Sequence, residues 1–182
     1  MYNFMPRKEE IENTFRNSNS HDKLFDAFRE ALAAGINDVE IYKVLLANPI
    51  LSNDELVLFT EKLAQEFREY CYEYYMWTAG LFESKFPDMN SLEYSLKYYT
   101  KAVLCGTGKD KPLLKILKLY NYDFDISLND KIISLVENSF ESVNNKSRIY
   151  KELSLHYKRT GEEKKFKLYG KLSEKEARNK NQ

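Results

Sequence analysis

Residues 150–173 read YKELSLHYKRTGEEKKFKLYGKLS, and this stretch is more informative about the fold than any other part of the chain. Large apolar residues recur every three or four positions on both sides of Thr160-Gly161, a pattern typical of two amphipathic helices joined by a tight turn. Ser154 and Ser173 stand among these residues at the same helical spacing. Because small side chains let two helix backbones approach closely, we predict an antiparallel helix pair here.

The spacing of this pair resembles one unit of the tetratricopeptide repeat family. Tyr150, Leu153 and Tyr157 stand at the family's large aromatic, leucine and tyrosine positions, and Gly161 stands at its turn. Phe166 departs from the family pattern, in which alanine is usual at that position. The resemblance implies stacked helix pairs that bind other proteins along a groove and carry no chemistry of their own.

Helix starts in the second half of the chain recur with a similar period. We place first helices near residues 74, 110 and 145 and second helices near 91, 128 and 162, against a family period of about 34 residues. The predicted fold class is therefore all-α, a short tetratricopeptide-like solenoid of about eight to nine helices with three helix-pair repeats over residues 74–178. Another all-helical bundle or solenoid is the alternative.

The remaining segments also carry helical spacing, so we predict a single helical domain over residues 1–182. Residues 1–50 should form short helices, either as a further divergent pair or as a cap on the stack. At the other end, the charged tail that begins at Glu174 should fray, most clearly over residues 178–182.

A long central helix is predicted over residues 53–86. Ser52 and Glu55 make a capping-box pattern at its start, and no breaker follows until about residue 85. So long a helix must pack against several other elements or bend where Gly80 weakens it. Apolar residues recur along one edge of this helix as far as Leu81, and we expect Tyr70, Tyr74 and Trp77 to belong to this buried edge.

Composition indicates a soluble globular protein. Hydrophobic residues make up 43% and charged residues 31% of the chain, a balance that excludes wholesale disorder. Cys71 and Cys105 lack metal-binding spacing, which favours free thiols in a reducing compartment. The N-terminal sequence lacks the apolar run of a signal peptide, and the longest mostly apolar stretch, 74–82, is too short to span a bilayer. We therefore expect a cytoplasmic protein without membrane association.

The formal net charge is zero, but the charges are unevenly divided. Residues 1–84 carry 8 Lys/Arg and 15 Asp/Glu, whereas residues 85–182 carry 20 and 13. Residues 145–182 alone hold 12 basic and 5 acidic side chains, which equals the whole basic excess of the second half. Such asymmetry can steer a partner or align copies head to tail, and a merely solvated surface is the alternative.

The two histidines do not predict a catalytic or metal site. His21 stands at a helix start, where an exposed side chain is expected. His156 follows Glu152 on one helix face, where a groove or surface side chain is the preferred interpretation. We therefore predict no catalytic residue, no bound metal and no cofactor.

Two other patterns with a chemical meaning are incomplete. Glu66, Glu69 and Glu73 lie on neighbouring helical turns, but the chain has no Glu-x-x-His motif to complete a di-iron bundle. The segment Gly106-Thr-Gly-Lys109 lacks the first glycine and the Ser/Thr of a phosphate-binding loop. A solvated acidic face and an ordinary loop are the preferred interpretations.

The candidate binding surface is one basic side of the helix predicted over residues 146–160. In tetratricopeptide proteins this side of a first helix lines the concave groove, so the resemblance implies charge-assisted hydrogen bonds to the carboxylates of an acidic peptide. A solvated basic face is the alternative. The residues on this side are Arg148, Lys151, Leu155, Lys158 and Arg159.

Two tyrosines are further candidates for partner contact. Tyr72 and Tyr75 lie off the apolar edge of the long helix, in the densest aromatic segment of the chain. They either pack against another helix or line a partner-binding groove.

Three hypotheses about function follow. The first is a non-enzymatic scaffold or adaptor that binds a protein or peptide segment, an acidic one by preference; nucleic acid is a weaker candidate, since the net charge is zero and no recognised nucleic-acid module is present. The second is a self-assembling structural protein, a homo-oligomer that joins acidic and basic halves. The third is an all-helical enzyme whose site forms only in space, which a deep pocket holding His156 and several carboxylates would favour.

Overall fold

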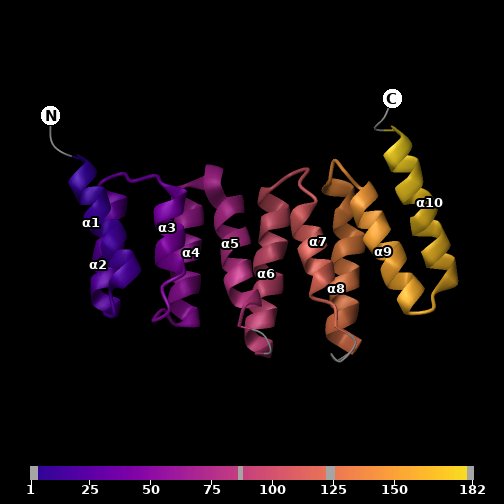
Figure 1. Ribbon diagram of the computed structural model, residues 1–182, viewed down its shortest axis with the longest axis horizontal. Helices are drawn as coiled ribbons and strands as arrows, with labels where there is room; N and C mark the ends of the chain where they lie inside the picture. The colour runs from indigo at the N-terminus through magenta and orange to yellow at the C-terminus, as the bar shows by residue number, and fades with distance from the viewer. Residues whose placement is uncertain (1–3, 86–87, 122–125, 180–182) are drawn as a thin grey trace. The chain divides into compact units, whose positions relative to one another are not determined.

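Helices make up most of the chain in the computed structural model, which describes residues 4–85, 88–121 and 126–179 (Figure 1). Ten α-helices and two short 3₁₀ turns occur in these residues, with no strand among them beyond an isolated bridge between Gly108 and Val143. The predicted all-α class is confirmed. The chain divides into two compact units, Met1–Ser84 (unit 1) and Lys85–Gln182 (unit 2), which are described separately. The expectation of a single domain stays a prediction.

Unit 1 contains five helices. Their bounds are α1 Phe4–Asn17, α2 His21–Ala33, α3 Val39–Leu46, α4 Asn53–Glu66 and α5 Cys71–Glu83. Capping side chains set several of the starts: Ser20 caps α2, Asp38 caps α3, and Ser52 with Glu55 forms the predicted capping box at α4. As predicted from helical spacing, short helices occur between residues 4 and 50, namely α1, α2 and α3.

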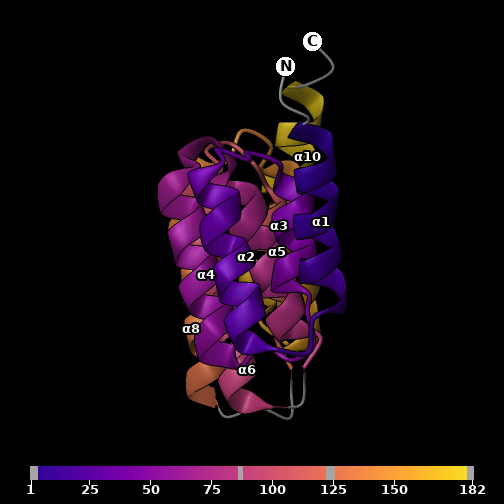
Figure 2. The same cartoon turned by 90° about the vertical axis from the view of Figure 1, so that its left-hand side faces the viewer.

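The core of unit 1 is built from aromatic rings. Within this unit α1 and α3 lie on one side, and α2 and α4 lie on the other (Figure 2). The fully buried ring of Tyr42 on α3 meets Phe15 of α1 and Phe28 of α2, and Phe28 in turn meets Phe59 of α4. Tyr42 also donates a hydrogen bond from its hydroxyl to the Ile36 carbonyl at 2.7 Å. These contacts join four helices through a few large side chains.

The helix predicted over residues 53–86 is two helices. α4 ends at Glu66, and Phe67 adopts φ −117° and ψ 71°, values outside the helical region. A 3₁₀ turn over Arg68–Tyr70 then leads into α5. The ring of Phe67 lies 5.6 Å from that of Tyr42, so the break places an aromatic side chain against the core. The interruption therefore lies at Phe67, whereas Gly80, the position where a bend was the alternative, lies within helix α5.

The break also changes which face of α5 is buried. Tyr74 is buried as predicted, together with Thr78, Ala79 and Phe82, but Tyr70 is only half-buried and Trp77 is 39% exposed. Its indole N–H donates a hydrogen bond to the Lys43 carbonyl at 3.2 Å. The prediction that Trp77 belongs to the buried edge is therefore wrong, since it assumed an unbroken helix through residue 67.

Unit 2 contains the other five helices. Their bounds are α6 Met89–Cys105, α7 Lys111–Lys118, α8 Ile126–Ser139, α9 Ser147–Arg159 and α10 Glu163–Asn179. Among these, α7 packs against α6, α8 and α9, while α10 packs on α9 (Figure 1). The segment 106–109 is a loop, as predicted, and the first predicted repeat has one helix, α5, in unit 1 and the other, α6, in unit 2.

The pair α9–α10 has the close antiparallel packing predicted from its small residues. Ser154 donates a hydrogen bond to the Phe166 carbonyl at 3.0 Å, and Ser147 and Ser173 exchange hydrogen bonds with each other's carbonyls. A methyl group added at Gly170 would lie 3.4 Å from the Ser154 hydroxyl. Gly161 forms the turn with φ +78°, a conformation that glycine adopts without steric cost.

The C-terminal tail differs from its prediction. α10 continues to Asn179, so residues 174–179 are helical where fraying was expected from Glu174. Residues 180–182, the rest of the predicted frayed tail, lie outside the described residues.

Candidate functional site

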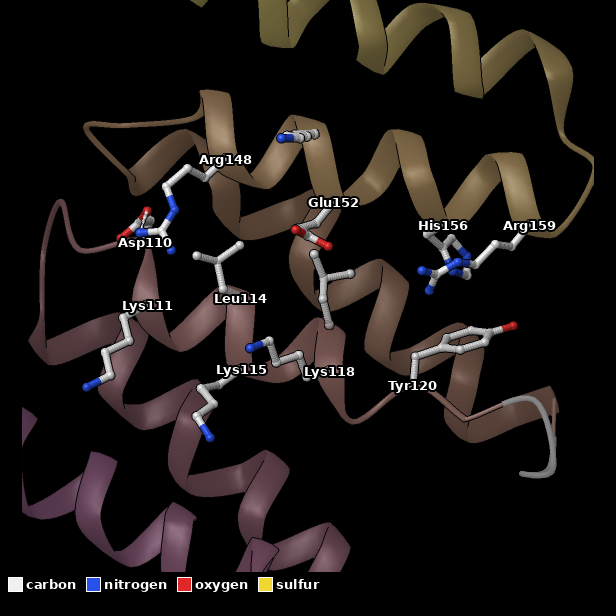
Figure 3. Close-up of a pocket in the computed structure, with 12 residues that line it drawn as sticks. Asp110, Lys111, Leu114, Lys115, Lys118, Tyr120, Arg148, Glu152, His156 and Arg159 are labelled. Atoms are coloured by element: carbon white, nitrogen blue, oxygen red, sulfur yellow. Dashed lines mark hydrogen bonds and ion pairs between the residues drawn. The ribbon is translucent and has the colours of Figure 1, made fainter. Parts of the chain in front are cut away.

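A groove of about 850 Å³ lies between α7 and α9 in unit 2 (Figure 3). At one end Arg148 of α9 meets Asp110, which directly precedes α7, and at the other end His156 of α9 meets Tyr120, which closely follows α7. The two helices therefore run in the same direction along the groove. The lining residues are Asp110, Lys111, Leu114, Lys115, Leu117, Lys118, Tyr120, Arg148, Lys151, Glu152, His156 and Arg159.

Helical periodicity places the basic residues of α7 on the groove side. Leu113 and Ile116 are buried in unit 2, while Lys111, Lys115 and Lys118 recur three or four residues apart on the other side of the helix. Pro112 occupies the first turn of α7, where its missing N–H leaves no backbone hydrogen bond unmade. The eight-residue helix thus presents a lysine from each turn.

The opposite wall is built by α9 in the same way. Ile149, Leu153 and Tyr157 are buried and anchor the helix in unit 2. The groove side carries two cations beyond Arg148, namely Lys151 and Arg159, together with Glu152 and His156. Six Lys/Arg and two Asp/Glu side chains therefore line the groove, which makes it strongly basic.

Most of these cations are available to a ligand. Arg148 Nη1 lies 3.2 Å from Asp110 Oδ2, an exposed ion pair at one end of the groove that engages one of the five N–H donors of the guanidinium. Lys115 lies over the Tyr99 ring, 6.0 Å from its centroid. The other four cations make no ion pair with any residue in the described part of the chain; these are Lys111, Lys118, Lys151 and Arg159.

His156 forms the aromatic end of the groove. Its ring is half-buried, 4.5 Å from the ring of Tyr120 and 5.0 Å from that of Tyr157, measured between centroids. Burial lowers the pKa of His156 below its ordinary value of 6.5; the Glu162 carboxylate opposes this shift and the Arg159 guanidinium adds to it. His156 is therefore neutral at pH 7 and offers a ligand a flat ring with a polar edge.

Of the five predicted residues of α9, three line the groove and two do not. Arg148, Lys151 and Arg159 line the groove, whereas Leu155 and Lys158 do not. Leu155 is 38% exposed, and the Lys158 ammonium lies 5.7 Å from the centroid of Phe166, on the α10 side of the helix. The geometry thus separates three groove cations from a fourth basic residue on the same helix.

Tyr72 and Tyr75 lie elsewhere in the chain. Both are half-buried on α5 of unit 1, and neither lines the α7–α9 groove. Their role in partner contact stays a prediction.

The lysines of α7 and Tyr120 were not identified from the sequence. The signal that could have found them is the lysine spacing in Lys111–Lys118, opposite the buried Leu113 and Ile116. Because α7 and α9 are separated by about thirty residues along the chain, their shared groove follows only from the packing.

The described residues contain neither a metal-binding cluster nor a membrane-spanning helix. No three His, Cys, Asp or Glu side chains among them lie close enough to share a metal ion. No helix in residues 4–85, 88–121 or 126–179 combines the length and apolar character needed to cross a membrane.

The chain was compared with models of known protein families, with curated proteins and with solved structures, and none of them matches it. The description that the fold itself supports is an all-helical protein with a basic groove in its second unit.

Proposed function

We propose that the chain is a non-enzymatic interaction scaffold that binds an acidic segment of a partner protein in the α7–α9 groove. The observation that carries this proposal is the row of four cations without ion pairs among the described residues, in a groove of about 850 Å³. A groove of this size takes a short segment of a partner, since ligand pockets commonly measure about 300–1,000 Å³. Carboxylates would form charge-assisted hydrogen bonds with these lysines and Arg159.

We also propose that the helices of unit 2 are tetratricopeptide-like. α6, α8 and α10 begin at Met89, Ile126 and Glu163, which are 37 residues apart, close to the family period of about 34. The close α9–α10 packing through Ser154 and Gly170 supports the same interpretation. In such an arrangement α7 and α9 are the first helices of successive pairs, and the groove between them is where a ligand segment lies.

Charge reversal tests the binding proposal directly. The probe is a fluorescein-labelled peptide of about twelve residues that carries four Glu among Ser and Gln, followed by fluorescence anisotropy. Lys118→Glu with Lys151→Glu should weaken its binding by about tenfold or more, because two favourable charge contacts become repulsive. Affinity for the unaltered protein should fall as salt is raised.

The matched control is the double variant Lys158→Glu with Lys164→Glu. It changes the net charge by the same amount, and both residues are exposed and lie outside the groove. Its affinity should stay within about twofold of the unaltered protein. Equal loss in both double variants would show a non-specific charge effect, and unchanged binding in the groove variant would remove the groove from the proposal.

The enzyme hypothesis is less well supported by the groove. His156 does lie in it together with Glu152 and Asp110, but Asp110 pairs with Arg148 at the opposite end. The ring nitrogens of His156 make no hydrogen bond with a described residue, whereas a general base is normally oriented by such a partner.

Self-association is the second candidate function. The acidic and basic portions of the sequence coincide with the two compact units, because unit 1 carries the excess of Asp/Glu and unit 2 the excess of Lys/Arg. Copies could therefore attract each other through unlike units. Sedimentation of the full chain across salt concentrations tests this candidate, and a monomer at low salt would contradict it.

A further inference from the structure

Glu152 carries a negative charge in a groove whose lysines and arginines favour acidic ligands. Figure 3 shows its carboxylate between the two ends of the groove. Glu152 is four residues from Arg148 and four from His156, which corresponds to about 6 Å along the α9 axis in each direction. The side chain is exposed and makes no ion pair with any residue that the structure describes. Cations line the same groove, yet none of the described ones approaches the carboxylate within 4 Å, so its charge is available to a ligand.

We propose that Glu152 determines the charge pattern of the ligand: it receives a basic or hydrogen-bond-donating side chain that lies between two acidic ones. This inference rests on the proposed function and adds the specificity of the same groove. An acidic side chain opposite Glu152 would be repelled, whereas a lysine or arginine there would complete an ion pair. Uninterrupted polyanions are therefore disfavoured, although the groove as a whole is basic.

The volume of the groove favours an extended ligand. Neighbouring strands are about 4.8 Å apart and stacked sheets about 10 Å, so an extended chain occupies roughly 48 Å² in cross-section. A groove of about 850 Å³ then holds about 18 Å of extended chain, or roughly five residues. A helix about 10–12 Å across would fit over only about 8–11 Å of its length.

The spacing of the charged residues along α9 predicts the positions of the charged side chains in the ligand. Arg148 and Arg159 are about 16 Å apart along the helix axis, a distance that about five residues of an extended segment span. Glu152 lies about 6 Å from the first and about 10 Å from the second, which corresponds to about two and three extended residues. The expected ligand carries acidic side chains two residues before and four residues after the central basic one, because these are the even spacings closest to the two distances and even spacings keep all three side chains on one face of an extended chain.

Two peptides that differ only at the central residue test this proposal. Both contain the segment Glu-Ser-X-Ser-Ser-Ser-Glu, with X either Lys or Glu, and are labelled for fluorescence anisotropy with the full chain. Net charge alone predicts tighter binding of the Glu-centred peptide, because it is the more negative of the two and the groove is basic. Our proposal predicts the opposite order, with the Lys-centred peptide tighter by about fivefold.

Substitutions at Glu152 sharpen the test. Glu152→Lys should reverse the order of the two peptides, and Glu152→Gln should leave the Lys-centred peptide no tighter than the other. The matched control is Glu93→Lys on α6, which makes the same charge change at an exposed residue outside the groove and should keep the order of the unaltered protein.

The outcomes separate this inference from the proposed function. Tighter binding of the Glu-centred peptide by the unaltered protein, or the same order in the unaltered protein and in Glu152→Lys, would overturn the role of Glu152 and leave acidic-segment binding standing. Failure of both peptides and of the four-Glu peptide to bind would overturn both proposals.

Discussion

At the scale of single residues, one carboxylate joins three helices of unit 2. Glu137 of α8 accepts hydrogen bonds from the hydroxyl groups of Tyr157 on α9, at 2.7 Å, and Tyr169 on α10, at 2.8 Å. The two rings are stacked 5.6 Å apart, and the Lys165 ammonium donates a hydrogen bond to the Tyr157 hydroxyl at 3.2 Å. Because α9 also forms a wall of the groove, this cluster fixes the position of that wall.

The cluster predicts a loss of stability at alkaline pH. Burial, together with the hydrogen bond to Glu137, raises the pKa of Tyr157 and of Tyr169 above the ordinary value of 10.0. The folded state therefore holds both phenol protons more tightly than the unfolded chain does. Stability from this source is fully present below about pH 10 and is lost as the pH rises above it, by at most about 1.4 kcal/mol per pH unit for each tyrosine.

Urea unfolding followed by circular dichroism measures this effect. The urea concentration at the unfolding midpoint should decrease as the pH is raised from about 9 to about 11. The decrease should be smaller in the double variant Tyr157→Phe with Tyr169→Phe, which lacks both titrating groups. A midpoint that is flat across this range in the unaltered chain would contradict the description of the cluster.

Some residue-level features were predictable from local sequence and others were not. Ser154 and Ser173 were expected at a close helix crossing, and both make hydrogen bonds across it. The exposure of Trp77 was not predictable, because its position depends on the break at Phe67 and on the Lys43 carbonyl of another helix. The spacing of apolar residues predicts which face of a helix is buried only where the helix is continuous.

At the scale of helices, starts were easier to predict than interruptions. The capping box of Ser52 and Glu55 is a local hydrogen-bonded pattern, so it can be read in four residues. The break at Phe67 has no glycine or proline beside it, and its aromatic contact is with Tyr42, 25 residues earlier. Tertiary contact, which the sequence pattern does not show, accompanies this interruption.

Alanine substitutions at two glycines should change the stability of the fold in opposite directions. Gly80 lies inside α5, and a methyl group added there would meet no atom within 4 Å, so Gly80→Ala should stabilise the fold by about 0.5–1 kcal/mol. Gly161 also has open space around it but adopts φ +78°, so Gly161→Ala should destabilise the fold by about 1–2 kcal/mol.

Thermal unfolding of the two glycine variants checks these signs. A change of about 1 kcal/mol corresponds to about 2–4 °C in Tm for a chain of this size. The Gly80 variant should melt above the unaltered protein and the Gly161 variant below it. A lower melting temperature for Gly80→Ala would show that α5 is interrupted at Gly80 after all.

At the scale of the whole molecule, charge follows structure. The acidic and basic portions of the sequence are the two compact units, so each unit has its own electrostatic character. The basic excess of residues 145–182 was predictable by counting, and so were three groove residues, Arg148, Lys151 and Arg159. The second wall of the groove was not, because α7 joins α9 only through packing in unit 2.

Binding of an acidic segment between α7 and α9 is tested most directly by NMR. The measurement is a titration of the ¹⁵N-labelled full chain with the four-Glu peptide, monitored through backbone amide shifts. We predict shifts concentrated in residues 110–120 and 148–159, with smaller shifts at the same positions when salt is raised. No shifts at saturating peptide, or shifts confined to unit 1 and to the face of α10 away from α9, would contradict the proposal.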